Sequence, residues 1–89
     1  MSQVIDNRTA GRFELAEQGE TAIAAYTLDG DAIVFTHTEV PPALEGHGVG
    51  SRLIAGALAQ VRAAGLKVVP ACSFVAAYLR RHPEAADLA

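Results

Sequence analysis

The stretch EGHGVGSRL, residues 45–53, sets glycines at alternate positions between a strand pattern and a helix pattern. Glycines at such a junction let the backbone approach a ligand closely, and the first turn of a helix carries free N–H groups and a partial positive charge. The combination favours an anion, most simply a phosphate or a pyrophosphate. The pattern is equally typical of a tight turn that leads into a helix and binds nothing. It is not a P-loop, because no Gly-Lys-Ser/Thr follows.

The chain on either side of this loop reads as strand, helix and strand. Residues 32–40 form the strongest strand pattern, and the pair of prolines that follows ends it. Residues 48–64 have helical spacing of apolar residues, and Gly65 is a typical helix stop. Residues 66–69 then form a short strand broken by a proline. Three such elements in about 30 residues make a βαβ unit, which predicts parallel pairing of the two strands.

The segment before residue 32 predicts an antiparallel meander. Residues 12–15 alternate polar and apolar side chains, and residues 21–28 form a second strand. Asp29-Gly30-Asp31 is a hairpin signal between this strand and the next. Residues 1–11 are polar, and we expect either a tail or a short edge strand there.

A last helix is expected over residues 73–81, because the proline at position 83 disfavours helix at the residue before it. The predicted fold is therefore α+β: a mixed sheet made of an antiparallel meander followed by a βαβ unit, with a C-terminal helix. A length of 89 residues suits one domain, residues 1–89.

Composition narrows the classes of function. The 51% apolar content suits a folded core, and the net charge of −3 without a basic stripe argues against nucleic-acid binding. A single Cys and three His without ligand spacing make a structural metal improbable, so no metal is expected. No apolar run is long enough for a membrane helix and no signal peptide is visible, so a cytoplasmic protein is expected without a membrane partner.

Four stretches in order resemble the GCN5-related N-acetyltransferases, and most closely their minimal single-domain branch. They are residues 37–41, 46–50, 69–72 and 81–84, and the resemblance covers nearly all of residues 12–88. One departure concerns Glu45, which stands where most of that superfamily has Arg or Gln. A carboxylate beside a pyrophosphate is unfavourable unless it turns away.

The resemblance implies that acetyl-CoA is the cosubstrate, with its pantetheine arm in a splay between the two parallel strands and its pyrophosphate at the glycine loop. It implies direct transfer of the acetyl group to an unknown amine acceptor, either a protein lysine or a small amine. Two alternatives stay open: a CoA or acyl-CoA binding module with little turnover, and a structural domain that binds nothing. The cofactor contacts that the resemblance implies are Thr38, Val40, Gly46, His47, Gly48, Val49, Gly50 and Ser51.

Three side chains are candidates for catalysis. His37 lies mid-strand, and it is either a general base, since an imidazole suits that role near neutral pH, or a polar residue on a half-exposed sheet. Strict alternation would place it on one face with Phe35 and Glu39. Cys72 follows the neighbouring strand, so it could lie near His37 and act as a nucleophile, or simply pack beside the CoA sulfur; at a helix N-cap its pKa would fall. Tyr78, on the last helix, is either a general acid to the leaving thiolate, as the resemblance implies, or a core residue. The basic residues 80–82 read as a solvated helix end or as contacts to the adenosine phosphate.

Overall fold

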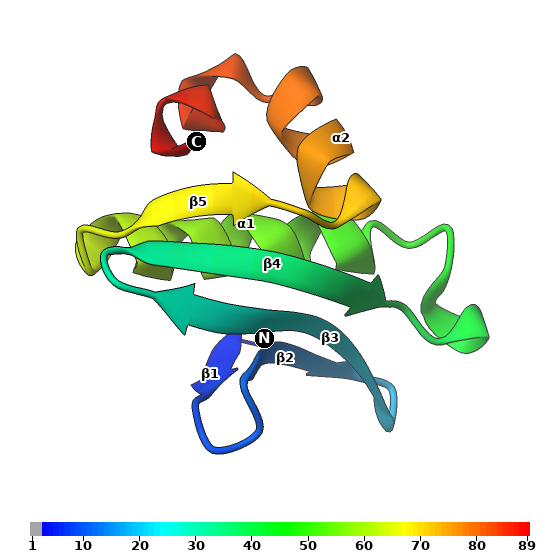
Figure 1. Ribbon diagram of the computed structural model, residues 1–89. Helices are drawn as coiled ribbons and strands as arrows, with labels where there is room; N and C mark the ends of the chain where they lie inside the picture. Colours follow the sequence, from blue (N-terminus) through cyan, green and yellow to red (C-terminus); the bar gives the residue numbers. More distant parts are fainter. Residues whose placement is uncertain (1–2) are drawn as a thin grey trace.

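The structure, a computed structural model, describes residues 3–89 and contains a five-stranded mixed sheet with two helices (Figure 1). The strands lie in the order β1-β2-β3-β4-β5; neighbours are antiparallel except β4 and β5, which are parallel. The predicted α+β arrangement of meander, βαβ unit and C-terminal helix is therefore confirmed. The elements are β1 (Ile5–Asn7), β2 (Arg12–Glu17), β3 (Glu20–Asp29), β4 (Ala32–Glu39), α1 (Val49–Ala63), β5 (Lys67–Pro70) and α2 (Ser73–Arg81), with short 3₁₀ helices at Pro42–Leu44 and Pro83–Leu88.

Most predicted boundaries agree with the structure to within a residue or two, and the differences have local causes. The edge-strand alternative for the N-terminal segment is the right one, since β1 pairs with β2. β5 includes Pro70 at its last position, where a missing N–H does little harm to the ladder. The 3₁₀ helix at Pro83–Leu88 was not predicted; Arg62 holds it to α1 through bonds of 2.9 and 2.8 Å to the Asp87 carboxylate.

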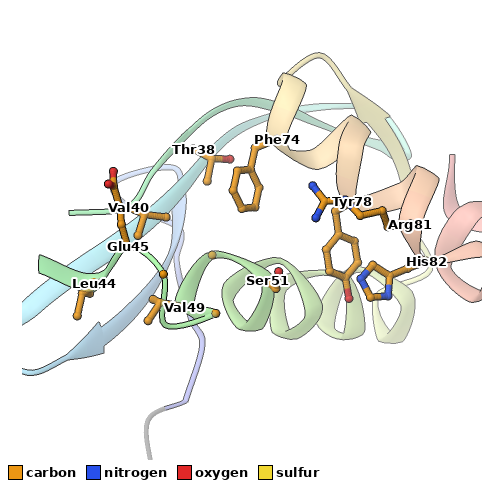
Figure 2. Close-up of a pocket in the computed structure, with 13 residues that line it drawn as sticks. Thr38, Val40, Leu44, Glu45, Val49, Ser51, Phe74, Tyr78, Arg81 and His82 are labelled. Atoms are coloured by element: carbon orange, nitrogen blue, oxygen red, sulfur yellow. The ribbon is translucent and has the colours of Figure 1, made fainter. Parts of the chain in front are cut away.

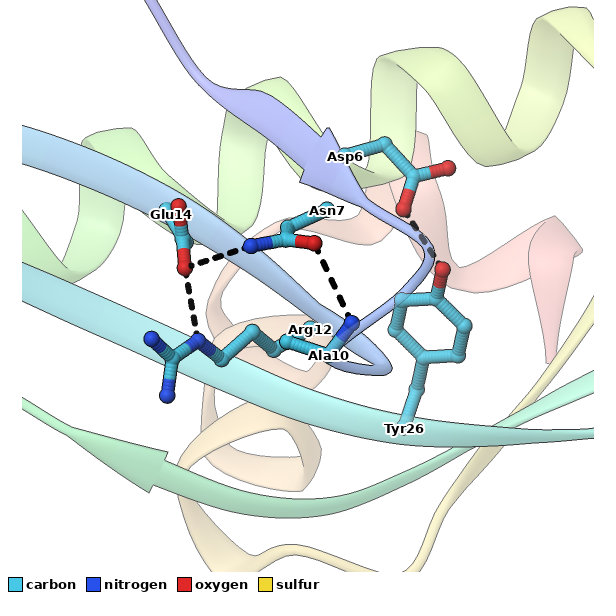
Figure 3. Close-up of polar contacts among 6 residues, drawn as sticks. All are labelled: Asp6, Asn7, Ala10, Arg12, Glu14 and Tyr26. Carbon is cyan, nitrogen blue, oxygen red and sulfur yellow. Dashed lines mark hydrogen bonds and ion pairs between the residues drawn. The ribbon is translucent and has the colours of Figure 1, made fainter.

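Polar contacts fasten the short edge strand β1 to the sheet (Figure 3). The Tyr26 hydroxyl donates a 2.5 Å hydrogen bond to Asp6, and the Asn7 amide donates to Glu14 at 3.2 Å. Arg12 donates to the same Glu14 carboxylate at 2.6 Å. Burial and the bond to Asp6 raise the pKa of Tyr26 to about 12. β1 is thus held by side chains as well as by its three-residue ladder.

One face of the sheet packs against both helices, and the core lies between them. Alternate strand residues such as Ala22 and Ala24 are fully buried there, together with the apolar stripes of α1 and α2. In Figure 1, α1 runs behind β4 and β5. The glycine inside α1, Gly56, has a packing reason, because a Cβ there would collide with the side chain of Val4. The small residue therefore accommodates the N-terminal segment.

An irregularity in β4 reverses the alternation of its side chains. Ala25 pairs with His37 and the next β3 residue, Tyr26, pairs with Phe35, so Thr36 is an extra residue in β4. Such a bulge shifts every later side chain to the other face of the sheet. The expectation that Phe35 and His37 share a face is therefore wrong. Phe35 faces the helices, whereas His37 and Glu39 lie on the outer face.

The parallel pairing of β4 and β5 stops before β4 ends. The ladder runs from Ala32–Lys67 to Phe35–Pro70, while β4 continues to Glu39. The last residues of β4 are therefore unpaired on the β5 side. Within the described residues, no helix combines the length and the apolar content that crossing a membrane requires.

Candidate functional site

The start of α1 presents backbone amides that nothing in the loop caps. Gly48 is the N-cap residue, with a left-handed φ of 72° and no side-chain cap hydrogen bond. The first N–H groups of any helix lack partners within the helix. The first turn of α1 also contains no acidic side chain that would repel an anion. The amides of residues 49–51 can therefore bind a negatively charged group.

These amides open into a cavity of about 420 Å³ between β4, the glycine loop, α1 and α2 (Figure 2). Its size lies within the range of pockets for small molecules and cofactors. The lining includes every residue that the resemblance implied as a cofactor contact except His47, which is exposed. That these residues bind CoA stays a prediction. The complete lining is Thr38, Val40, Leu44, Glu45, Gly46, Gly48, Val49, Gly50, Ser51, Phe74, Tyr78, Arg81 and His82.

Phe74 is the main lining residue that the sequence did not reveal. Its ring projects from the first turn of α2 towards the start of α1, and it is 38% exposed (Figure 2). A Cβ on Gly50 would lie 2.5 Å from this ring and 3.2 Å from the Val40 side chain. Gly50 is thus needed for the packing of α2 on α1. Gly46 and Gly48 differ, because their positive φ values of 81° and 72° favour glycine while the space beside them is open.

Cys72 lies immediately behind the cavity wall. It is the N-cap residue of α2 and is 8% exposed. Its Sγ lies 3.2 Å from Oγ1 of Thr38, which lines the cavity. Burial alone would raise the pKa of the Cys72 thiol, but the hydrogen bond with Thr38 and the amides of Val75 and Phe74 outweigh burial and lower it below its ordinary value.

His37 is not part of the cavity lining. Its side chain is 60% exposed on the outer face of the sheet, where Nε2 lies 3.6 Å from the Glu39 carboxylate. The side chain that forms a polar contact with the Cys72 thiol is Thr38 rather than His37. The bulge at Thr36 explains the difference, because it turns His37 outward and Thr38 inward, opposite the buried Ala24.

Tyr78 lines the cavity further along α2. Its ring stacks on His82 with centroids 4.0 Å apart and an interplanar angle of 19°. The ring hangs from α2 towards α1 in Figure 2. Burial, together with the charge of Glu84, raises the pKa of the Tyr78 hydroxyl, which therefore stays protonated at neutral pH and can donate. Arg81 adds a positive charge at this end of the cavity.

Comparison with known proteins shows the family of the chain. The family model described as GCN5-related N-acetyl-transferase matches residues 12–88. The chain belongs to this family. Comparison with curated proteins gave no match. Membership in the GCN5-related N-acetyltransferases supports an acetyltransferase type of activity and fits the mixed sheet described above.

The residues that line the cavity fit an acidic cofactor by their chemistry, because free amides lie at one end and Arg81 lies at the other (Figure 2). Arg52, in the first turn of α1, is occupied elsewhere, because it forms a two-pronged ion pair with Glu17. Glu45 lines the cavity, and in Figure 2 its carboxylate points away from the start of α1. Among residues 3–89, no three His, Cys, Asp or Glu side chains are grouped as metal ligands would be.

Proposed function

We propose that this protein transfers an acetyl group from acetyl-CoA to an amine. The observation that carries the proposal is the uncapped start of α1, which opens into a cavity of suitable size in a chain of the matching family. The amides of the glycine loop and the first turn of α1 would bind the pyrophosphate.

The thioester is proposed to lie near Thr38, beside the unpaired last residues of β4. There the amine nitrogen attacks the carbonyl carbon, the carbon–sulfur bond breaks and CoA leaves as a thiolate. Free edge groups of β4 are suited to pair with the pantetheine arm as an added strand would. Transfer is proposed to be direct, with Cys72 as a neighbour of the thioester and not as an acyl carrier.

Two proton transfers accompany this step. His37, on the outer face of β4, would accept the proton of an amine that approaches from that side of the sheet. Tyr78, whose hydroxyl is held protonated, would donate to the leaving thiolate. His37 and Tyr78 thus lie on opposite sides of β4. This arrangement suits a reaction in which the amine and acetyl-CoA approach from different sides of the sheet.

A CoA-binding module with little turnover is the second candidate. The position of His37 favours it, because the predicted general base lies outside the cavity lining. Turnover separates the two candidates. Acetyl-CoA is incubated with the protein and a panel of amines, and release of CoA is followed by chromatography so that the Cys72 thiol does not contribute. Amine-dependent CoA release supports the enzyme, and tight binding without release supports the module.

A further inference from the structure

A second cavity adjoins the first at the end of β4. Its volume is about 460 Å³, and it shares Thr38, Val40 and Glu45 with the first cavity. Its other lining residues are Thr21, Glu39, Pro41 and Pro42. Because Glu39 lies on the outer face, this cavity reaches the side of the sheet on which His37 lies. The two cavities are therefore neighbours along the end of β4.

The charges that line this second cavity are both negative. They belong to Glu39 and Glu45, and no Lys or Arg is among the lining residues. Glu39 has His37 at 3.6 Å, whereas Glu45 forms no ion pair within residues 3–89. The nearest Arg along the chain, Arg52, is already bound to Glu17. Two carboxylates without a fixed cation therefore border a space large enough for a small ligand.

The position of Glu45 is otherwise hard to explain. Beside an anion site a carboxylate is unfavourable, and in Figure 2 the carboxylate of Glu45 points away from the helix start that would hold the anion. The same side chain lines the second cavity. A negative charge at this place is favourable if the neighbouring ligand is a cation.

We propose that the second cavity binds the acceptor, and that the acceptor is an amine with a second positive charge a few carbons away. This inference rests on the proposed function. Glu39 and Glu45 hold the second charge, and the reacting amine reaches the thioester past Thr38. The amine nitrogen forms the new bond to the carbonyl carbon, the thiolate of CoA departs, and the proton lost by the amine leaves through His37.

This proposal is tested with three acceptors that share a primary amine and a similar carbon chain. They differ in the group at the other end of the chain, which is positive in 1,5-diaminopentane, neutral in pentylamine and negative in 5-aminopentanoate. The wild-type kcat/KM is expected to fall in that order. Glu39→Gln and Glu45→Gln should each lower the preference for the diamine over pentylamine by about fivefold, the size of an exposed ion pair. Because any effect of Glu39→Gln on His37 changes all three acceptors alike, the ratio isolates the far-end charge.

Asp29→Asn is the matched control, since it removes the same charge at the hairpin between β3 and β4 and lines neither cavity. It should leave the order of the three amines unchanged. Equal kcat/KM values for the three acceptors, or a preference that survives both Glu→Gln changes, would overturn the inference while leaving acetyl transfer intact.

Binding of 1,5-diaminopentane by NMR provides a readout that does not depend on turnover. Changes in backbone amide chemical shift should concentrate at residues 21, 38–40 and 43–45 and should become smaller in Glu45→Gln. If acetyl-CoA is neither bound nor used, the proposed function fails, and the diamine titration still decides whether this cavity takes a dication. Shifts that are absent, or that spread over the acidic surface and persist in Glu45→Gln, would contradict the site.

Discussion

Oγ1 of Thr38 lies 3.2 Å from Sγ of Cys72, and this contact links the wall of the main cavity to the N-cap of α2. The bulge at Thr36 makes it possible, because it turns Thr38 towards the helices. The thiol is thus held beside the place where we propose that the thioester lies, yet it is buried behind the cavity wall. This position suits a supporting role better than that of an acyl carrier.

Thr38→Val should raise the pKa of the Cys72 thiol, because it removes the side-chain hydrogen bond that helps to lower it. The pH dependence of the thiolate absorbance measures the change, and the chain has a single Cys. Thr36→Val is the matched control, since the Thr36 hydroxyl lies near the Ala25 carbonyl instead, at 3.4 Å. Equal pKa values in the wild type and Thr38→Val would show that the contact does not act on the thiol.

Incubation with acetyl-CoA alone should leave no stoichiometric acetyl adduct on Cys72, which intact-protein mass spectrometry can establish. Cys72→Ala should keep much of its activity, whereas His37→Ala should lose about 10²-fold or more if its imidazole is the general base. An adduct on Cys72 that an added amine discharges would contradict direct transfer. Loss of all activity in a folded Cys72→Ala protein would do the same.

Stability should fall as the pH rises above about 10, the ordinary pKa of tyrosine, towards the value of about 12 for Tyr26 in the folded chain. A group whose folded pKa is raised keeps its proton in the native state and loses it in the unfolded state, so alkali favours unfolding. The contribution is at most about 1.4 kcal/mol for each pH unit in this window. Urea unfolding at pH 8, 10 and 11 measures it.

Tyr26→Phe removes this titration, and its stability should depend less on pH between 10 and 11 than that of the wild type. The comparison isolates Tyr26 from Tyr78, whose pKa is also raised. If the stability of the two proteins depends on pH in the same way, the raised pKa of Tyr26 is contradicted.

Gly50→Ala should destabilise the protein by about 1–3 kcal/mol, because the new methyl group would lie 2.5 Å from the Phe74 ring. In a Phe74→Ala background the same change should be close to neutral, because only the milder 3.2 Å approach to the Val40 side chain remains and alanine is the better helix former. Urea unfolding of the single and double variants gives the coupling. If the two substitutions change the free energy of unfolding additively, the Phe74 ring is not the reason that glycine is needed at position 50.

The order of elements could be predicted from the sequence because its signals are strong and local. Helical spacing followed by Gly65 marks α1, and the proline at position 83 marks the end of α2. The parallel pairing of β4 with β5 follows from the length of the connection between them. The glycine loop as a place for an anion followed from the same βαβ unit, whereas the individual lining residues near it were implied by the resemblance to the GCN5-related N-acetyltransferases.

The orientation of His37 could not be predicted in this way. A bulge adds one residue to a strand without a sequence signal of its own, so nothing in the run from Ile33 to Val40 indicates that the register shifts at Thr36. Phe74 was missed for a related reason. Its place in the cavity depends on how α2 packs on Gly50, which is a tertiary contact that neither helix signals alone.

Titration calorimetry of acetyl-CoA against the wild type, Gly48→Val and Gly30→Val tests the central claim most directly. Both glycines have a left-handed φ, 72° and 60°, with open space around them, so both substitutions impose similar strain. Gly30 lies in the distant hairpin between β3 and β4, outside the lining of the main cavity. Loss of a single charge-assisted amide contact corresponds to about tenfold in affinity. We predict that Gly30→Val binds like the wild type and that Gly48→Val binds about tenfold more weakly or worse. A folded Gly48→Val protein with unchanged affinity, or a wild type that does not bind, would contradict the account.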